Sequence, residues 1–544
     1  MVSPVGPKDF DVSLKFGGGI KSRASEDDIA VNECADGVNF DLDLENREFK
    51  NRQPFDLVDT ATNASQINGF AQLIKQDGTT STLVQAGTTV YEWDGAGTFT
   101  SKGTVAAGVA IRGRLTHNFT LDEKVLISDL NMIQPVMEWD GTTLANITHN
   151  LTGAFIAKYI FVENERANYG HVSSNGVLTP HMLVGSKQGD YDNLSTSAKP
   201  SSALAVDDPF FMLTPDLRPI NGLISAFGKV VMSSANGSMF YITGVNSKDF
   251  AITSLYPNSA ANGDESMAHI GNDVAYGRQG RIESLLSTAT FGDVETDDLT
   301  RSIANKVSGF NGWTTVFNSR LQRVYFFPAG QSEIWVLHKP LLDDETSKRK
   351  NTILSKDTIP AISPWSKWTT THALAFQPTA VMNFLDPVDG LEYVFMGDAS
   401  GNIYRLEGSG VAGDGGTTSI SSERLSKLFT VPLDTQAYEI QGWIKYRRNT
   451  QGAVTVTLAL EYAGNNIFNQ AITIIIPALS AGAHYGAANY YDGENYYGTK
   501  FSNRLVRQPI DVSGMSNEYQ VRITVDSKFD FQINEVGLRF LAAT

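Results

Sequence analysis

The sequence has a single cysteine, Cys34, among 544 residues. An intrachain disulfide is therefore impossible, so disulfides do not stabilise this fold. The surrounding stretch Val-Asn-Glu-Cys-Ala-Asp-Gly matches no catalytic cysteine signature, and no histidine is near it in the sequence. We expect Cys34 to be a packed thiol rather than a nucleophile.

Long apolar runs are also missing. The longest, Ala471 to Leu479, is interrupted by Thr473 and Pro477 and is far too short to cross a bilayer. The first segment, Met1 to Arg23, lacks the apolar core of a secretory signal peptide. We therefore expect a chain that is synthesised in a cytoplasm and does not insert into a membrane.

Catalytic and metal-binding motifs are absent from the sequence too. It has no Gly-x-x-x-x-Gly-Lys-Ser/Thr loop for phosphate and no Gly-x-Ser-x-Gly nucleophile elbow. None of its histidines has another histidine two, three or four residues away. The eight are His117, His149, His171, His181, His269, His338, His372 and His484. We predict that the chain is not an enzyme and has no catalytic, cofactor or metal site, with a metal site assembled across distant strands as the alternative.

Two short patterns invite a functional interpretation. Gly17, Gly18 and Gly19 are consecutive, but no helical segment follows them, so we expect a flexible turn rather than a phosphate-binding loop. Asp41, Asp43 and Glu45 alternate along one expected strand and could together bind Ca²⁺. Because the spacing of a calcium-binding loop is absent, we expect the solvated face of an amphipathic strand instead.

Basic residues are too few for a protein that grips nucleic acid. Lysine and arginine number 43 against 59 aspartates and glutamates, a formal charge of −16. Such a surface repels phosphate backbones, whereas proteins that hold a duplex carry a basic stripe. The densest basic cluster, Lys348 to Lys350, follows acidic residues at 343–345 and predicts a solvated loop.

Helical periodicity is scarce, while alternation of apolar and polar residues is common. Val454 to Tyr462 and Tyr519 to Val525 are clear examples, and Gly, Asn and Asp bound such runs. Alternation directs every second side chain toward a core, which is the signature of a half-buried strand. The sequence therefore predicts an all-β protein, and its length predicts more than one structural unit.

One hexapeptide recurs. Val-Tyr-Glu-Trp-Asp-Gly from Val90 to Gly95 returns as Val-Met-Glu-Trp-Asp-Gly from Val136 to Gly141, 46 residues later. That offset is close to one four-stranded propeller blade, and Asp-Gly is typical of a tight hairpin turn. We predict a β-propeller of about six to eight blades. The alternative is a non-repetitive sandwich or barrel with similar turns.

The amino-acid composition changes after the repetitive part of the sequence. Gly408 to Ser422 is rich in Gly, Ser and Thr, which predicts a linker at 411–424. We expect a propeller domain over 1–410 that includes the N-terminal strands, and an antiparallel β-sandwich over 425–544. Within the latter, the Tyr-, Gly- and Asn-rich segment 485–498 is either a protein contact loop or a loop folded on its own domain.

Several passages resemble the β-propeller tail proteins of tailed bacteriophages. The stretch from Phe16 to Pro54, which ends in a strand and Arg52-Gln53-Pro54, is similar to their opening. The strand-turn-strand Val274 to Leu285, the segments 288–293 and 298–303, the Trp-Asp-Gly turns and the ending Phe529 to Phe540 are similar to their later parts. The nearest group in kind is the nozzle family of short-tailed phages, also called tail tubular protein B or packaged-DNA stabilisation protein.

The resemblance implies a structural virion protein, made in the bacterial host cytoplasm and incorporated into the phage tail. Six copies would form a ring below the portal and adaptor that retains packaged DNA and forms part of the ejection channel. Double-stranded DNA would pass without sequence-specific binding, and fibres, a needle or tip proteins would attach at the periphery or below. The alternatives are another virion propeller (a baseplate hub, head-closure or fibre-attachment protein) and a carbohydrate-binding or polysaccharide-degrading propeller. For the last, Trp365 and Trp368 could stack on sugar rings, although we expect them to pack within a blade.

Overall fold

The computed structural model consists almost entirely of strands, as expected. It describes residues 10–16, 18–22, 29–30, 32–42, 48–112, 123–195, 205–226, 228–235, 237–256, 260–262, 265–271, 273–288, 293–341, 363–369, 377–408, 414, 419–430, 437–447, 453–462, 471–476, 502–509, 518–527 and 531–542. Within these ranges, α1 (Ala304–Val307) is a single helical turn, and residues 339–341 are also helical. All strand pairings in the sheets are antiparallel apart from a few isolated bridges.

Seven four-stranded sheets follow one another along the described chain. Blade 1 contains β6 (Ile67–Ile74), β7 (Thr80–Ala86), β8 (Thr89–Trp93) and β9 (Phe99–Thr104). Blade 2 contains β10 (Ile111–Arg112), β11 (Val125–Asp129), β12 (Met137–Trp139) and β13 (Leu144–Asn146). Blade 3 contains β14 (Phe155–Glu163), β15 (Arg166–Ser174), β16 (Val177–Gly185) and β17 (Phe210–Leu213). Each blade is a meander of neighbouring strands, so its pairing is local in sequence.

The next four sheets repeat this order. Blade 4 contains β18 (Ile220–Ala226), β19 (Lys229–Ser234), β20 (Met239–Thr243) and β21 (Ala251–Tyr256). Blade 5 contains β22 (Met267–His269), β23 (Val274–Arg278), β24 (Arg281–Thr288) and β25 (Asp293–Asp298). Blade 6 contains β26 (Trp313–Asn318), β27 (Arg323–Pro328), β28 (Glu333–His338) and β29 (Trp365–Thr369). Blade 7 contains β30 (Ala380–Leu385), β31 (Glu392–Gly397), β32 (Asn402–Arg405) and, from near the N-terminus, β5 (Asp56–Thr60).

The seven sheets close into a ring. The first strands of neighbouring blades contact one another, with β11 providing the contact from blade 2 to β14, and β30 contacts β6. Strand β5 supplies the outer strand of blade 7, where Asp56 is opposite Arg405 and Thr60 is opposite Asn402. The prediction of a propeller with six to eight blades is thus confirmed, and the described residues form seven. Closing the ring leaves only short, protected strand edges, which limits edge-to-edge association.

The recurring hexapeptide occupies equivalent places in blades 1 and 2. Each copy covers the third strand and the turn into the fourth, with Trp93 at the end of β8 and Trp139 at the end of β12. Both indoles are buried. Gly95 and Gly141 have φ values of +79° and +89°, a backbone region that glycine enters without steric cost. The repeat therefore marks a true structural period.

Two six-stranded sheets form the second body. The first contains β3 (Phe40–Leu42), β4 (Phe49–Asn51), β40 (Gln532–Ala542), β35 (Ala437–Arg447) and β38 (Ser502–Pro509), with β1 (Phe10–Lys15) paired to β40. The second contains β2 (Asp36–Val38), β33 (Ile420–Leu425), β39 (Glu518–Ser527), β36 (Val454–Tyr462) and β37 (Ala471–Ile476), with β34 (Phe429–Thr430) paired to β39. Alternate residues of β36 and β39 face a common apolar core, so the expected sandwich is present.

The domain boundaries differ from those expected at two places. Strands β1 to β4 belong to the sandwich rather than to the propeller, and the propeller begins at β5. The expected linker 411–424 includes the buried Asp414 and most of β33. Alternation indicated the strand around Asp41, but the Gly-, Ser- and Thr-rich composition hid β33, and neither pattern carries information about a partner several hundred residues away, such as Phe540 opposite Phe10.

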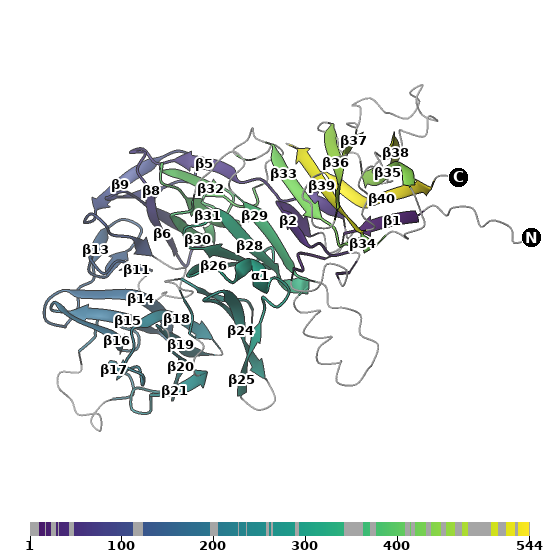
Figure 1. The fold of residues 1–544 in the computed structure, drawn as a ribbon. Coiled ribbons are helices and arrows are strands. Elements are labelled where there is room, and N and C mark those ends of the chain that lie inside the picture. The colour runs from purple at the N-terminus through teal and green to yellow at the C-terminus, as the bar shows by residue number, and fades with distance from the viewer. Residues whose placement is uncertain are drawn as a thin grey trace, which may run out of the picture.

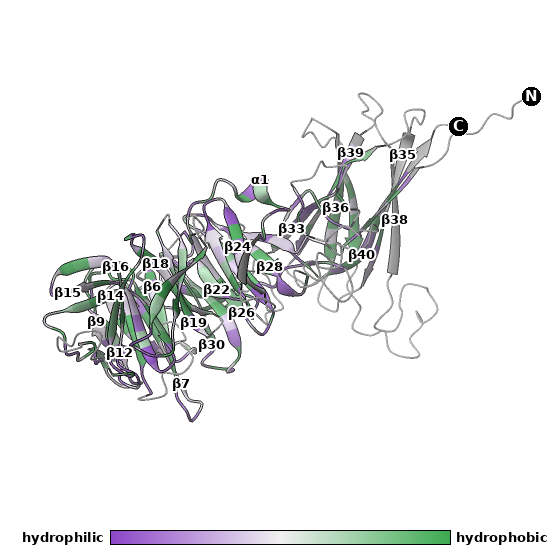
Figure 2. Ribbon diagram, turned by 90° about the horizontal axis from the view of Figure 1, so that it is seen from below, coloured by the Kyte–Doolittle hydropathy of each residue, from purple (hydrophilic) through white to green (hydrophobic). Residues whose placement is uncertain are grey.

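The propeller and the sandwich lie side by side as an elongated pair (Figure 1). Viewed from below, the propeller occupies one end of the molecule and the sandwich the other (Figure 2). The first and last described strands, β1 and β40, both lie in the sandwich. Within the described residues, no helix combines the length and apolar character needed to span a bilayer.

Candidate functional site: the junction of propeller and sandwich

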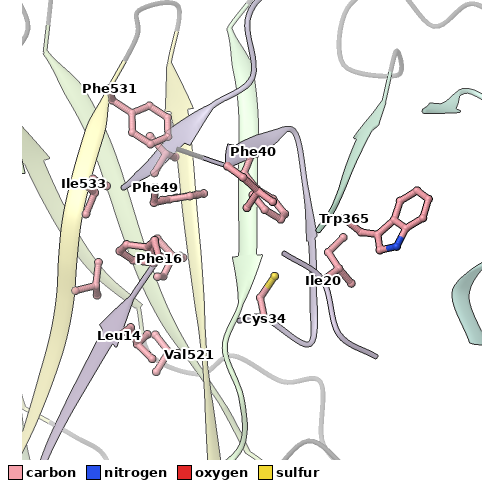
Figure 3. Packing of buried hydrophobic residues seen from close by; sticks show 14 of the residues in the cluster. Leu14, Phe16, Ile20, Cys34, Phe40, Phe49, Trp365, Val521, Phe531 and Ile533 are labelled. Carbon is pink, nitrogen blue, oxygen red and sulfur yellow. The ribbon is translucent and has the colours of Figure 1, made fainter. Parts of the chain in front are cut away.

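A single apolar cluster continues from the sandwich into blades 5 and 6. It joins residues of β36, β39 and β40 to Trp313, Trp335 and Trp365 of the propeller. Figure 3 shows Phe16, Phe40, Phe49 and Phe531 packed between the strands, with Cys34 and Ile20 on the side of Trp365. Because this core is shared, separating the two bodies would expose buried aromatic surface to water.

Residues 18–22 and 36–42 lie against the outer strand of blade 6, β29. The amide of Gly19 donates to the carbonyl of Ser363 at 2.7 Å, and that of Ile20 donates to the carbonyl of Trp365 at 2.9 Å. A Cβ on Gly19 would lie 1.9 Å from the carbonyl oxygen of Trp365, so only glycine permits this approach. The expected flexible turn at Gly17 to Gly19 is therefore wrong for its last residue, which is buried and held against β29.

Asn39 connects three parts of the chain at the junction. Its backbone amide donates to the Lys367 carbonyl at 2.7 Å, and its side-chain amide donates to the Ser421 carbonyl at 3.1 Å. Its side-chain oxygen accepts from the Thr369 amide at 2.9 Å and from Arg52 Nε at 3.0 Å. Asn39 is fully buried with φ +57°, a conformation that asparagine tolerates better than most residues.

Arg52, the arginine of the Arg-x-Pro motif, forms a buried bidentate ion pair. Its Nη1 and Nη2 lie 2.8 and 2.5 Å from the carboxylate oxygens of Asp414. The guanidinium also stacks on Phe55, 3.6 Å from the ring centroid. Asp414 further accepts the Phe55 amide at 2.9 Å. A bidentate pair fixes the relative orientation of its two side chains. It therefore holds the segment before β5, where the chain enters the propeller, against the segment after β32, where the chain leaves it.

A second buried network lies nearby around Arg323 of β27. Its Nη2 is 2.8 Å from Asp41 of β3, and its Nη1 is 2.7 Å from Glu407, which also accepts the hydroxyl of Tyr325. Burial alone would raise the pKa of Asp41, but Arg323, together with Lys50, holds that pKa below its ordinary value. Burial raises the pKa of Glu407 despite Arg323. Arg323 thus pairs with a carboxylate of the sandwich, Asp41, and also contacts a carboxylate of the propeller, Glu407.

Burial keeps two further titratable groups at the junction, His338 and Cys34, in their uncharged forms. Burial, with Arg323 next to it, lowers the pKa of His338 to about 3, so this histidine is neutral near pH 7. Its Nε2 is 3.0 Å from the hydroxyl of Ser366. Burial raises the pKa of the Cys34 thiol to about 12, as fits the expected packed thiol.

Several residues weighed from the sequence can now be placed. Trp365 and Trp368 are fully buried, and their indole N–H groups donate to the carbonyls of Leu299 and Phe40, so neither presents a face for sugar stacking. The solvated-face interpretation of Asp41 is wrong, because this carboxylate is buried and paired. Asp43 and Glu45 lie outside the described residues, as do Lys348 to Lys350 and the segment 485–498. No group of three or more metal-binding side chains occurs in the described ranges.

Comparisons with known proteins identify no relative by sequence. No family model matches the chain. No curated protein matches it either. Among solved structures, YCF48 from Cyanidioschyzon merolae aligns at 12% identity over 65% of this chain and 98% of that one, with a TM-score of 0.37. The Cps50 (Swd1) β-propeller domain from Myceliophteria thermophila aligns at 10% identity over 65% and 100%, with a TM-score of 0.39. The WD40 domain of Toxoplasma gondii coronin aligns at 10% identity over 68% and 87%, with a TM-score of 0.35. At such values only the propeller class is in common, and that class already follows from the strand pairing.

Proposed function

We propose that this chain is a structural component of a tailed-bacteriophage particle, a ring-forming nozzle or tail-hub subunit below the portal and adaptor. The observation that supports it is the junction: a closed propeller and a sandwich share one core and two buried charge networks. A stiff two-part subunit suits a ring, because cyclic assemblies use two different surfaces of each copy. The role is architectural, and the proposal includes no catalysis.

The charge supports passage of DNA rather than binding. With a net charge of −16, acidic side chains outnumber basic ones, so in this proposal a DNA duplex slides without being held by salt-dependent contacts to its phosphates. In this proposal the packaged DNA is retained by the closed tail and leaves through the centre of a homohexameric ring. Fibres, a needle or tip proteins would attach at its outer or lower surfaces. Another virion propeller role remains the alternative within the same class.

The carbohydrate alternative loses its two candidate residues, because Trp365 and Trp368 are buried in the junction. The deciding experiment mixes the purified chain with the adaptor protein that we expect a neighbouring reading frame to encode, and images the mixture by negative-stain electron microscopy. Sixfold rings are the expected result. A chain that stays monomeric with adaptor present and that clears capsular polysaccharide would overturn the proposal. Neighbouring reading frames that encode no portal, adaptor or fibre would count against it as well.

A further inference from the structure

The outer edge of blade 3 is an apolar strand exposed to solvent. This strand, β17, has the sequence Phe-Phe-Met-Leu and lies on the side of the propeller away from the sandwich (Figure 1). Phe211 and Leu213 are 42% and 49% exposed, and Leu178 on the neighbouring β16 is 57% exposed. Among the described outer strands, only β17 exposes two large apolar side chains. Such an edge invites pairing with another strand.

The other outer strands have protection that β17 lacks. The outer strand of blade 6, β29, is covered by residues 18–22 and 36–42. Charged side chains occur in β5, β9 and β25. Strand β13 has three residues, and β21 exposes no large apolar side chain among those described. The apolar edge of β17 is therefore an exception within its own fold.

The pairing of β17 leaves backbone groups of two residues directed outward. The amide of Thr214, which directly follows β17, donates to the His181 carbonyl at 2.9 Å, and Leu213 lies opposite Met182. Residues of an antiparallel strand alternate between bonding to the neighbouring strand and pointing away from it. Phe211 and Leu213 therefore direct their N–H and C=O groups away from β16. No described strand pairs with this side of β17.

We propose that β17 binds an extended segment of a partner protein as a fifth, antiparallel strand of blade 3. The residues opposite Phe211 and Leu213 would be apolar, because opposite residues of an antiparallel pair lie on the same face of the sheet. The fold already completes blade edges in this way: β5 pairs with β32, and the Asn39 amide donates to the Lys367 carbonyl of β29. The site is independent of the proposed role in a phage tail.

Charge favours a partner protein over a second copy of this chain. Carboxylates flank β17, with Asp207 and Asp208 before it and Asp216 after it. In the two-fold pairing that matches all four residues of β17, Asp207 would lie opposite Asp216 of the second copy, and like charges directly opposite are destabilising. Lys187, 3.6 Å from Asp207, and the exposed Arg218 offset only part of this charge. A segment with basic residues at its ends therefore fits β17 better than β17 itself does.

Fluorescence anisotropy with the full-length chain tests the site. The probe is a labelled, end-blocked peptide of sequence Lys-Val-Thr-Val-Thr-Val-Lys. In the proposed pairing the valine amides face β17 and the threonine amides face away from it. N-methylation of two valine amides should weaken binding at least about tenfold, whereas N-methylation of both threonine amides should leave it unchanged. Equal affinity of the two methylated peptides, or no binding of the parent peptide up to about 1 mM, overturns the proposal.

Two leucine variants separate β17 from general attraction to exposed apolar side chains. Leu213→Thr removes apolar surface at the proposed site. Leu57→Thr on β5 is the matched control, because Leu57 is 44% exposed on the outer strand of blade 7. We expect the first to weaken binding of the parent peptide about fivefold and the second to leave it unchanged. Equal loss in both variants overturns the site, and circular dichroism confirms that each is folded.

The choice of occupant is tested separately. Sedimentation velocity of the chain without peptide should show no dimer that depends on Leu213. A dimer abolished by Leu213→Thr would assign the edge to a second copy and overturn the partner segment. A peptide with glutamate in place of both lysines should bind several times more weakly at low salt, and equal binding of the two would overturn the preference for basic ends.

Discussion

At the scale of single residues, the junction depends on buried charges that are fully paired. Arg52 has 0% and Asp414 3% of its side chain exposed, and Asp41 has 3%. Such pairs add little net stability compared with apolar residues, but breaking one leaves a charge stranded away from water. The consequence is that single substitutions here report on the junction far more strongly than substitutions of surface ion pairs do.

Asp41→Asn should lower the free energy of unfolding at pH 7 by about 2–3 kcal/mol, somewhat less than a fully broken buried pair, because Glu407 still contacts Arg323. The folded-state pKa of Asp41 is depressed, so its contribution is present above the unfolded value of about 3.9 and disappears as the pH falls through the folded pKa. Urea unfolding should show a smaller difference in the free energy of unfolding between the variant and the wild type at pH 3 than at pH 7.

The matched control for that substitution is Asp11→Asn, which breaks the exposed pair with Arg539. An exposed pair contributes at most about 1 kcal/mol, so this variant should unfold nearly as the parent does. If Asp41→Asn behaves like the Asp11 variant, or if its deficit is the same at both pH values, the buried pair does not stabilise the junction as argued.

Cys34 should be unreactive in the native protein. Burial raises the pKa of its thiol to about 12, so at pH 8 almost no thiolate exists and none is accessible. Incubation with an aromatic disulfide reagent should give no colour until urea unfolds the chain, after which one thiol per chain should react. Rapid labelling without denaturant would show that the core around Phe16 and Phe40 opens readily.

At the scale of elements, each Trp-Asp-Gly hairpin bonds its blade to the preceding one. The indole N–H of Trp93 donates to Asp59 of β5 at 2.9 Å, across the closure of the ring. That of Trp139 donates to the hydroxyl of Ser81 in blade 1 at 3.0 Å. The repeated motif therefore has two functions, a turn within a blade and a contact between blades.

Trp93→Phe keeps an aromatic side chain at this position but removes the hydrogen bond to Asp59 of β5. The substitution should therefore lower the free energy of unfolding by about 1–2 kcal/mol. Hydrogen exchange should accelerate in β5 and β32, because the closing strand is held less firmly. Trp139→Phe is the matched variant, with a similar loss of stability but no change in exchange of β5. Equal acceleration of β5 exchange in both would contradict the assignment of Trp93 to ring closure.

At the scale of the whole molecule, the sandwich is built from both ends of the chain. Strands β1 to β4 come from residues 10–51, and β33 to β40 come from residues 420–542. Between them the chain makes the whole propeller. Neither sheet of the sandwich is complete without its N-terminal strands, and the shared core continues into blades 5 and 6. We therefore predict that the two bodies unfold as one cooperative unit.

A fragment of residues 425–544 should fail to fold on its own, because it lacks β1 to β4 and most of β33. Its circular dichroism should be that of an unfolded or aggregated chain, whereas the full chain should unfold by urea in one transition seen equally by tryptophan fluorescence and far-ultraviolet dichroism. A monomeric fragment with dispersed amide proton shifts in its nuclear magnetic resonance spectrum would refute this.

Local pattern was enough for the architecture but not for the junction. The spacing of the Glu-Trp-Asp-Gly copies predicted a propeller, because each blade pairs strands that are neighbours in sequence. The pairing of Arg52 with Asp414 could not be predicted, because the two residues are 362 positions apart and no sequence motif links them. The one available signal was an arginine, Arg52, before a proline at the end of a strand-rich opening.

The all-β class and the tight Asp-Gly turns could be predicted from the sequence, because they depend on side-chain periodicity and on backbone freedom within a few residues, and the single cysteine excluded intrachain disulfides. The closure of the ring by β5, the place of β1 to β4 in the sandwich and the burial of Asp41 became known from the three-dimensional structure. Strand edges pair through backbone groups that every residue has in common, so the choice among distant partners comes from which apolar faces and charges fit together in three dimensions.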